Sequence, residues 1–91
     1  MTMYIDQFTA HGPLTEREID ELLDVAAKYT SRITVTCGDR SVHAPVLPWC
    51  WDTLPVRAGA TVSITAEGGR RGDEEDRLAL REFVRRFQRA G

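Results

Sequence analysis

The chain has 91 residues, so a single domain spanning residues 1–91 is the expected organisation. Its composition, 42% hydrophobic and 29% charged, excludes a largely disordered chain. The formal net charge of −2 argues against nucleic acid as a partner, and no apolar run is long enough to cross a membrane. The N-terminus lacks a signal-peptide pattern, and two cysteines, Cys37 and Cys50, are too few for a disulfide scaffold. We therefore expect a cytoplasmic protein with reduced thiols.

The first part of the chain predicts a short strand followed by a well-marked helix start. Residues 3–9 mix apolar and polar side chains as a strand does, and residues 11–13 (His-Gly-Pro) end it. Thr15 suits the N-cap position of a helix, and Glu18 completes the capping-box pattern three residues later. A helix should therefore begin directly after Thr15.

The helix itself is predicted over residues 16–28. Leu14 and Ile19 have the spacing of a hydrophobic staple, which fixes how the chain enters a helix. Apolar residues then recur at helical spacing and should form the buried face: Ile19, Leu22, Leu23, Ala26 and Ala27.

The middle of the chain predicts a hairpin and then an irregular segment. Residues 32–37 alternate apolar and polar side chains, residues 38–39 (Gly-Asp) signal a turn, and residues 40–44 can return as the second strand. Three prolines make residues 45–58 irregular, with room for one short helical turn around 49–53.

The last part predicts a strand and a second long helix. Residues 60–66 alternate cleanly, residues 67–72 form a loop, and residues 74–89 carry an apolar stripe at helical spacing. Two amphipathic helices need one shared apolar surface. A four-stranded antiparallel sheet with the helices on one face provides such a surface.

This order of elements and the local sequence resemble the HPr family, the histidine-containing phosphocarriers of the bacterial sugar phosphotransferase system. The run TSRITVTCGDRSVHA resembles the family's second strand and hairpin, LPVRAGATVSITAEG its closing strand, and DEEDRLALREFVRRF its last helix. The resemblance covers about residues 4–89. It implies an α+β fold, an HPr-like open-faced sandwich with a four-stranded antiparallel sheet and two to three helices on one face.

This sequence departs from the family pattern at the residue on which the family's chemistry depends. Family members carry a Gly-Leu-His-x-Arg-Pro pattern at the start of the first helix. Leu14 and Arg17 match that pattern here, whereas Thr15 takes the position of the phosphorylated histidine and Glu18 that of the proline. A threonine phosphate is a stable ester, so Thr15 could not relay a phosphoryl group as a histidine does. Val46 likewise corresponds to the regulatory serine that some members carry.

The segment Leu47-Pro48-Trp49-Cys50-Trp51 is the strongest candidate for a binding surface. In the family, the matching region carries an apolar patch beside the active histidine and docks partner proteins. Tryptophan is enriched at the energetic centres of protein interfaces. The alternative is that one or both tryptophans close the core, and we expect one to be buried and one partly exposed.

The sequence therefore predicts a protein without enzymatic activity, cofactor or metal. Cys37, His43 and Cys50 lack a close pair of ligands and supply only three nitrogen or sulfur ligands for zinc. The resemblance implies a non-canonical HPr-like protein that acts as a regulator or adaptor, with protein partners from the phosphotransferase system or its regulation. We expect the contact surface to include Thr15, Arg17, Leu47, Trp49 and Trp51.

Two alternatives stay open. His11 lies four residues before Thr15, and an imidazole is a competent nucleophile near neutral pH, so the protein could be a phosphocarrier with a displaced acceptor. The chain could also be an HPr-fold accessory protein that serves an unrelated pathway, because a fold does not fix a function.

Overall fold

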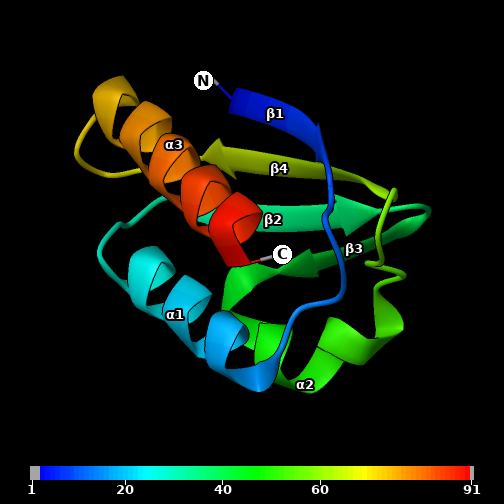
Figure 1. The fold of residues 1–91 in the computed structure, drawn as a ribbon. Helices are drawn as coiled ribbons and strands as arrows, with labels where there is room; N and C mark the ends of the chain where they lie inside the picture. The colour runs from blue at the N-terminus through cyan, green and yellow to red at the C-terminus, as the bar shows by residue number, and fades with distance from the viewer. Residues whose placement is uncertain (1–2, 91) are drawn as a thin grey trace.

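A four-stranded antiparallel sheet, in the order β1-β4-β2-β3, organises the computed structural model, which describes residues 3–90 (Figure 1). The strands are β1 at Met3–Thr9, β2 at Arg32–Cys37, β3 at Arg40–His43 and β4 at Thr61–Glu67. The helices are α1 at Glu16–Ala27, the one-turn α2 at Leu47–Cys50 and α3 at Asp73–Ala90. The predicted elements are all present, and their ends differ from the predicted ones by one residue at most outside the segment that contains α2.

The core lies between the sheet and the two long helices, which lie side by side on one of its faces (Figure 1). Alternate side chains of β2 and β4 point into this core, and the register places Val35 opposite Ile64. Phe83 and Phe87 of α3 are fully or almost fully buried against them. The alternation read from the sequence therefore does select the face that the helices cover.

The buried face of α1 differs from the predicted one. Ile19, Leu22 and Val25 are buried, whereas Leu23 and Ala26 are only half-buried and Ala27 is exposed. The prediction therefore missed Val25 and extended the stripe too far, because the helix packs on α3 and on the segment around α2 along residues three positions apart. The last residue of the helix consequently faces solvent.

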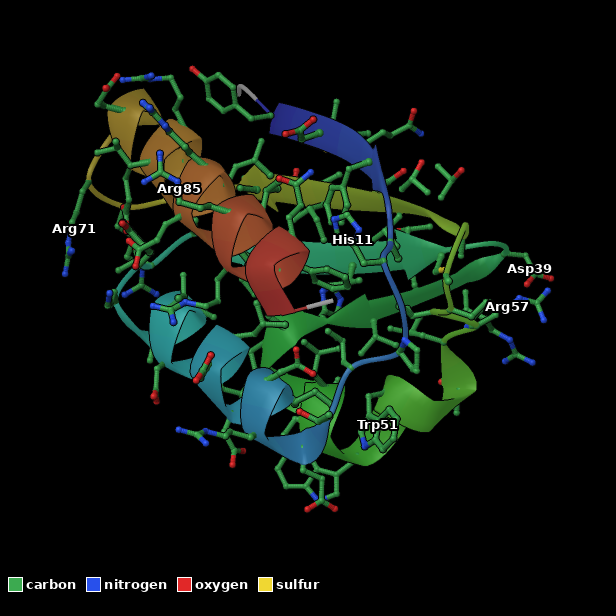
Figure 2. All side chains as sticks on the ribbon, viewed as in Figure 1. His11, Asp39, Trp51, Arg57, Arg71 and Arg85 are labelled. Atoms are coloured by element: carbon green, nitrogen blue, oxygen red, sulfur yellow. The ribbon has the colours of Figure 1, made fainter. Side chains whose placement is uncertain are left out.

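Helical structure in the middle segment begins earlier than predicted and is continuous. A 3₁₀ turn at Ala44–Val46 leads into α2, and a second 3₁₀ turn follows at Trp51–Thr53, where Figure 2 labels Trp51. Pro45 and Pro48 lie within the first two positions of their turns. A proline costs a helix nothing there, because the missing N–H has no intrahelical partner. These prolines start helical turns instead of excluding them.

A polar junction, formed by Glu75 and Asp76 with Thr30, Ser31 and Gly69, joins the start of α3 to two loops. Asp76 Oδ1 accepts hydrogen bonds from Ser31 Oγ at 2.5 Å and from Gly69 N at 2.8 Å. Glu75 accepts from both N and Oγ1 of Thr30. A Cβ atom at Gly69 would lie 2.6 Å from Asp76 Oδ1, so only glycine allows this close approach.

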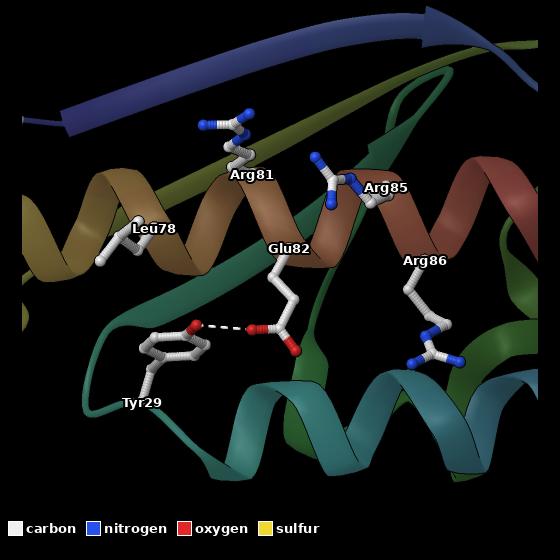
Figure 3. Close-up of a pocket in the computed structure, with 6 residues that line it drawn as sticks. All are labelled: Tyr29, Leu78, Arg81, Glu82, Arg85 and Arg86. Atoms are coloured by element: carbon white, nitrogen blue, oxygen red, sulfur yellow. Dashed lines mark hydrogen bonds between the residues drawn. The ribbon is translucent and has the colours of Figure 1, made fainter.

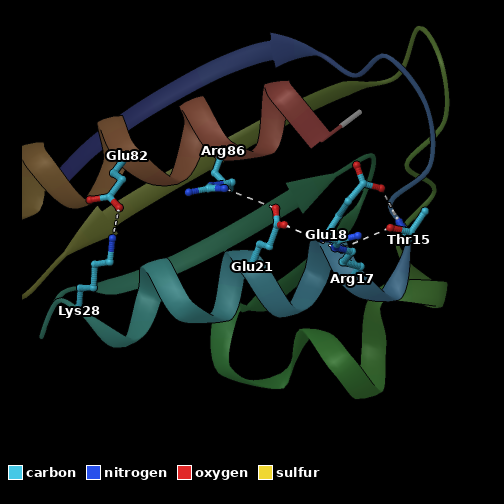
Figure 4. Close-up of polar contacts among 7 residues, drawn as sticks. All are labelled: Thr15, Arg17, Glu18, Glu21, Lys28, Glu82 and Arg86. Carbon is cyan, nitrogen blue, oxygen red and sulfur yellow. Dashed lines mark hydrogen bonds and ion pairs between the residues drawn. The ribbon is translucent and has the colours of Figure 1, made fainter.

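Two further polar contacts join α1 to α3. Glu82 accepts hydrogen bonds from Tyr29 Oη and from Lys28 Nζ, both at 2.6 Å (Figures 3 and 4). Arg86 lies 3.5 Å from Glu21 of α1. The bond from Lys28, followed by that from Tyr29, holds the pKa of Glu82 below its ordinary value.

We expect the protein to lose stability in acid below about pH 4.5. Burial acts to raise the pKa of Glu75, but the hydrogen bonds from Thr30 and the Arg71 amide outweigh this effect. The pKa of Glu75 is therefore below 4.5, and that of Glu82 is lowered as well. A lowered folded-state pKa contributes stability that is present above the unfolded-state pKa and is lost as pH falls through the folded-state value. Melting temperatures measured across this range by circular dichroism test this.

The matched variant for that experiment is Glu82→Gln. It removes one of the three carboxylates with a lowered pKa, the others being Glu74 and Glu75, so its melting temperature should fall less steeply in acid than that of the unmodified chain. A decline that begins above about pH 6 would contradict the assignment, because carboxylates do not titrate there unless their pKa is raised.

Candidate functional site

The N-terminal end of α1 is closed by its own side chains. Thr15 Oγ1 accepts a hydrogen bond from Glu18 N at 3.3 Å, and Glu18 Oε1 accepts one from Thr15 N at 2.8 Å (Figure 4). This is the capping box that the sequence predicted. Leu14, directly before the cap, is buried and anchors the chain in the core. The amides of Thr15 and Glu18 are therefore already bonded within the protein.

We expect Thr15→Ala to lower the free energy of unfolding by about 1 kcal/mol, because it removes the side-chain half of this capping box. Thr15→Ser should keep most of the stability, since its hydroxyl can accept the same hydrogen bond. Urea denaturation of the two variants beside the unmodified chain measures the difference. Equal losses in both variants would show that the methyl group of Thr15, not its hydroxyl, is the important part.

Arg17 turns along α1 and not toward the cap. Its side chain is 91% exposed, and its Nε atom lies 4.0 Å from Glu21 Oε1 (Figure 4). Glu21 also meets Arg86 of α3, so one carboxylate has two arginine neighbours. Arg17 is thus exposed to solvent, with its charge directed at Glu21.

The structure divides the tryptophan segment differently from the prediction. Trp49 is 76% exposed, Trp51 is half-buried, and Val46 is 42% exposed. Neither tryptophan is buried, which corrects the expectation that one would be. Leu47 has no exposed surface, so it belongs to the core and is wrongly placed on the contact surface. The single turn of α2 directs Leu47 into the core and leaves Trp49 on the surface.

Two hollows bring this segment together with the start of α1. Trp51 lines both of them and lies beside α1 (Figure 2). The larger hollow measures ≈ 230 Å³ and is lined by Pro13, Leu14, Trp51, Leu54 and Val56. The smaller measures ≈ 170 Å³ and is lined by Glu16, Ile19, Asp20, Pro48 and Trp51. We call this region, with the exposed Val46 and Trp49, the docking surface.

The sequence missed part of the docking surface. Val46 was read only as the residue at the position of a regulatory serine, and Pro13, Glu16 and Asp20 were not singled out. The sequence gives little sign of these residues, because nothing in the local pattern shows that the start of α1 and the segment around α2 line the same hollows.

The remaining candidate groups are His11 and the two cysteines, and they differ in exposure. His11 is exposed in the loop before α1, and its ring makes no hydrogen bond to any described residue, so nothing orients it as a nucleophile. Cys37 is buried, and burial raises the pKa of its thiol, whereas Cys50 is half-buried; both are free. Among the side chains that the structure describes, no group of three or more potential ligands could hold a metal ion.

No helix in the described part of the chain is long and apolar enough to cross a membrane.

Comparisons with family models and with curated proteins found no match. Among solved structures, the HPr phosphocarrier of Bacillus anthracis strain Ames matches with a TM-score of 0.76 at 19% identity, over 97% of this chain and 100% of that one. The histidine-containing phosphocarrier protein of a Mycoplasma matches with 0.70 at 18% identity, over 93% and 90%. HPr from Thermoanaerobacter tengcongensis matches with 0.63 at 26% identity, over 96% of each chain. The chain is therefore HPr-like in fold over nearly its whole length, which confirms the predicted open-faced sandwich.

Proposed function

We propose that this HPr-like protein is a regulatory or adaptor binding protein, related to the phosphotransferase system, that docks protein partners in the cytoplasm and does not relay phosphoryl groups. The observation behind this proposal is the capping box at the start of α1. The fold is similar to that of phosphocarriers. The sequence resemblance implies that Thr15 takes the position of their acceptor histidine, and the hydroxyl of Thr15 caps the helix.

The surroundings of Thr15 also disfavour a phosphoryl group. A helix N-terminus attracts anions through its free N–H groups and its dipole. Here the amide of Glu18 is bonded to Thr15, and the carboxylate of Glu18 is bonded to the amide of Thr15. Glu16 adds a second negative charge in the first turn. Arg17, the cation retained from the family pattern, faces Glu21 instead. A phosphate at Thr15 would therefore meet carboxylates first.

The docking surface supports the binding role. A side chain as large and apolar as Trp49 is rarely left 76% exposed without a partner, because its burial in an interface is strongly favourable. Trp51 contributes the wall of both adjacent hollows. Thr15, the N-cap of α1, and Arg17 are next to Glu16 in the sequence, although neither lines a hollow. Of the five predicted contact residues, the proposal retains all but Leu47.

Incubation with phosphoenolpyruvate and Enzyme I should leave the intact mass of the protein unchanged at neutral pH, because no residue at the α1 start can act as a relay. An authentic HPr phosphorylated in the same mixture is the control. An adduct that disappears in acid, that His11→Ala abolishes and that His43→Ala retains, would instead make the protein a phosphocarrier with a displaced acceptor.

A second experiment tests binding directly. Proteins retained from a cytoplasmic extract by the immobilised chain are identified by mass spectrometry, and Trp49→Ala should lose them. Leu78→Ala is the matched control, since Leu78 is also an exposed apolar residue, 42% exposed, but lies on α3. Partners lost equally in both variants would contradict a role for the docking surface. Partners from outside the phosphotransferase system would favour the repurposed accessory protein.

A further inference from the structure

The charged residues that line the docking surface are both acidic. Glu16 and Asp20 line the smaller hollow with Trp51, and the residues described around the larger hollow are all uncharged. Neither carboxylate forms an ion pair with any residue in the described part of the chain. Two carboxylates without an ion pair thus line a hollow together with the half-buried Trp51, which also forms part of the wall of the apolar hollow.

The arginines of α1 and α3 that form ion pairs in the described part of the chain do so with carboxylates other than Glu16 and Asp20. Arg17 lies toward Glu21, which also meets Arg86, on the side of α1 that faces α3 (Figure 4). A separate groove along α3 is lined by Tyr29 and by the arginines Arg81, Arg85 and Arg86 (Figure 3). The local sign at the docking surface is therefore negative although the whole chain carries a net charge of only −2.

The structure of α1 explains one of the two carboxylates and not the other. Glu16 is in the first turn, where the helix dipole favours an acid. Asp20 is one turn further along, where that effect has faded, and it is exposed beside Trp51 and Pro48. Helix stability alone does not account for an aspartate at this position.

We propose that the partner of this surface presents one large apolar side chain flanked by lysine or arginine. The apolar side chain would pack on Trp49 and Trp51, and the flanking cations would meet Glu16 and Asp20. The larger hollow, at ≈ 230 Å³, is below the roughly 300–1,000 Å³ typical of small-molecule sites, so a single side chain fits its size better. This inference rests on the proposed docking function and adds the chemistry of the partner.

The test is a selection of random peptides displayed on phage against the immobilised full-length chain. The selected peptides should share an aromatic or large aliphatic residue with lysine or arginine beside it. A synthetic peptide with that consensus should bind about tenfold more weakly to Glu16→Lys/Asp20→Lys, and more weakly to the unmodified chain as salt rises from about 50 to about 500 mM.

The matched control is Asp6→Lys/Asp39→Lys, which makes the same change in net charge at two exposed aspartates that line neither hollow. Asp6 is in β1 and Asp39 in the turn between β2 and β3, so neither lies on α1. This variant should bind the peptide within about twofold of the unmodified chain, since neither charge lines the docking surface and salt screens charges at longer range. Thermal melts of both double variants establish that each is folded.

The outcomes separate this inference from the proposal it rests on. Selected peptides that are acidic or uncharged, or that bind both double variants equally, overturn the basic partner while leaving the docking surface intact if Trp49→Ala abolishes their binding. Peptides that bind Trp49→Ala as well as the unmodified chain overturn the docking surface itself. Failure to enrich any peptide overturns both.

Discussion

Leu47→Ala should lower the free energy of unfolding by about 2–5 kcal/mol, whereas Trp49→Ala should change it by no more than about 0.5 kcal/mol. The two residues are neighbours in the same single turn of helix, α2. Leu47 has no exposed surface, and its truncation leaves a cavity that the surrounding core cannot fill. Trp49 is 76% exposed in the free protein, so its truncation removes little buried area.

Urea unfolding of the two variants measures this difference in stability. In the binding assay described above, Trp49→Ala should have the larger effect of the two. Trp49→Ala should lose partners while remaining as stable as the unmodified chain. A destabilised Trp49→Ala would mean that the ring is packed in solution, and the docking surface would then lose its central residue.

Asp76→Ala should lower the free energy of unfolding by about 3 kcal/mol, because it leaves one buried and one partly buried donor without an acceptor. The hydroxyl of Ser31 and the amide of Gly69 both donate to Asp76 Oδ1, and Asp76 is only 3% exposed. The loss comes from these stranded donors as much as from the missing carboxylate. Glu75 would still join the start of α3 to both loops through Thr30 and the Arg71 amide, so the variant removes only part of the polar junction.

Asp76→Asn is the control, since its amide oxygen can still accept from both donors and it should cost less than the alanine variant. Chemical denaturation of the pair gives the comparison. Equal destabilisation by the two substitutions would indicate that the negative charge, not the hydrogen-bond geometry, stabilises the polar junction.

The parts of the fold that the sequence predicted are those that short-range chemistry determines. The capping box needs only Thr15 and Glu18, three residues apart, and it formed as predicted. The alternation in residues 32–37 selects one face of a strand because successive side chains point to opposite faces. Each of these patterns can be read within one element, without knowing what packs against it.

The parts that the sequence missed depend on contacts between distant residues. In the segment around α2, the sequence does not show whether Leu47 or a tryptophan points inward, because the rest of the core decides it. The polar junction joins residues 45 positions apart, such as Thr30 and Glu75. The acidic run that contains Glu75 and Asp76 has the pattern of an ordinary helix start, where acids interact favourably with the helix dipole. The pattern does not indicate that these two side chains are buried.

The placement of the tryptophans has a practical consequence. The chain contains two, Trp49 and Trp51, and both belong to the docking surface. All indole emission from the protein therefore originates where a partner would bind, and the tyrosines contribute little when excitation is confined to the red edge of the absorption band. A ligand that covers these rings should shift the emission toward shorter wavelengths, so the unlabelled protein is its own optical sensor of occupancy.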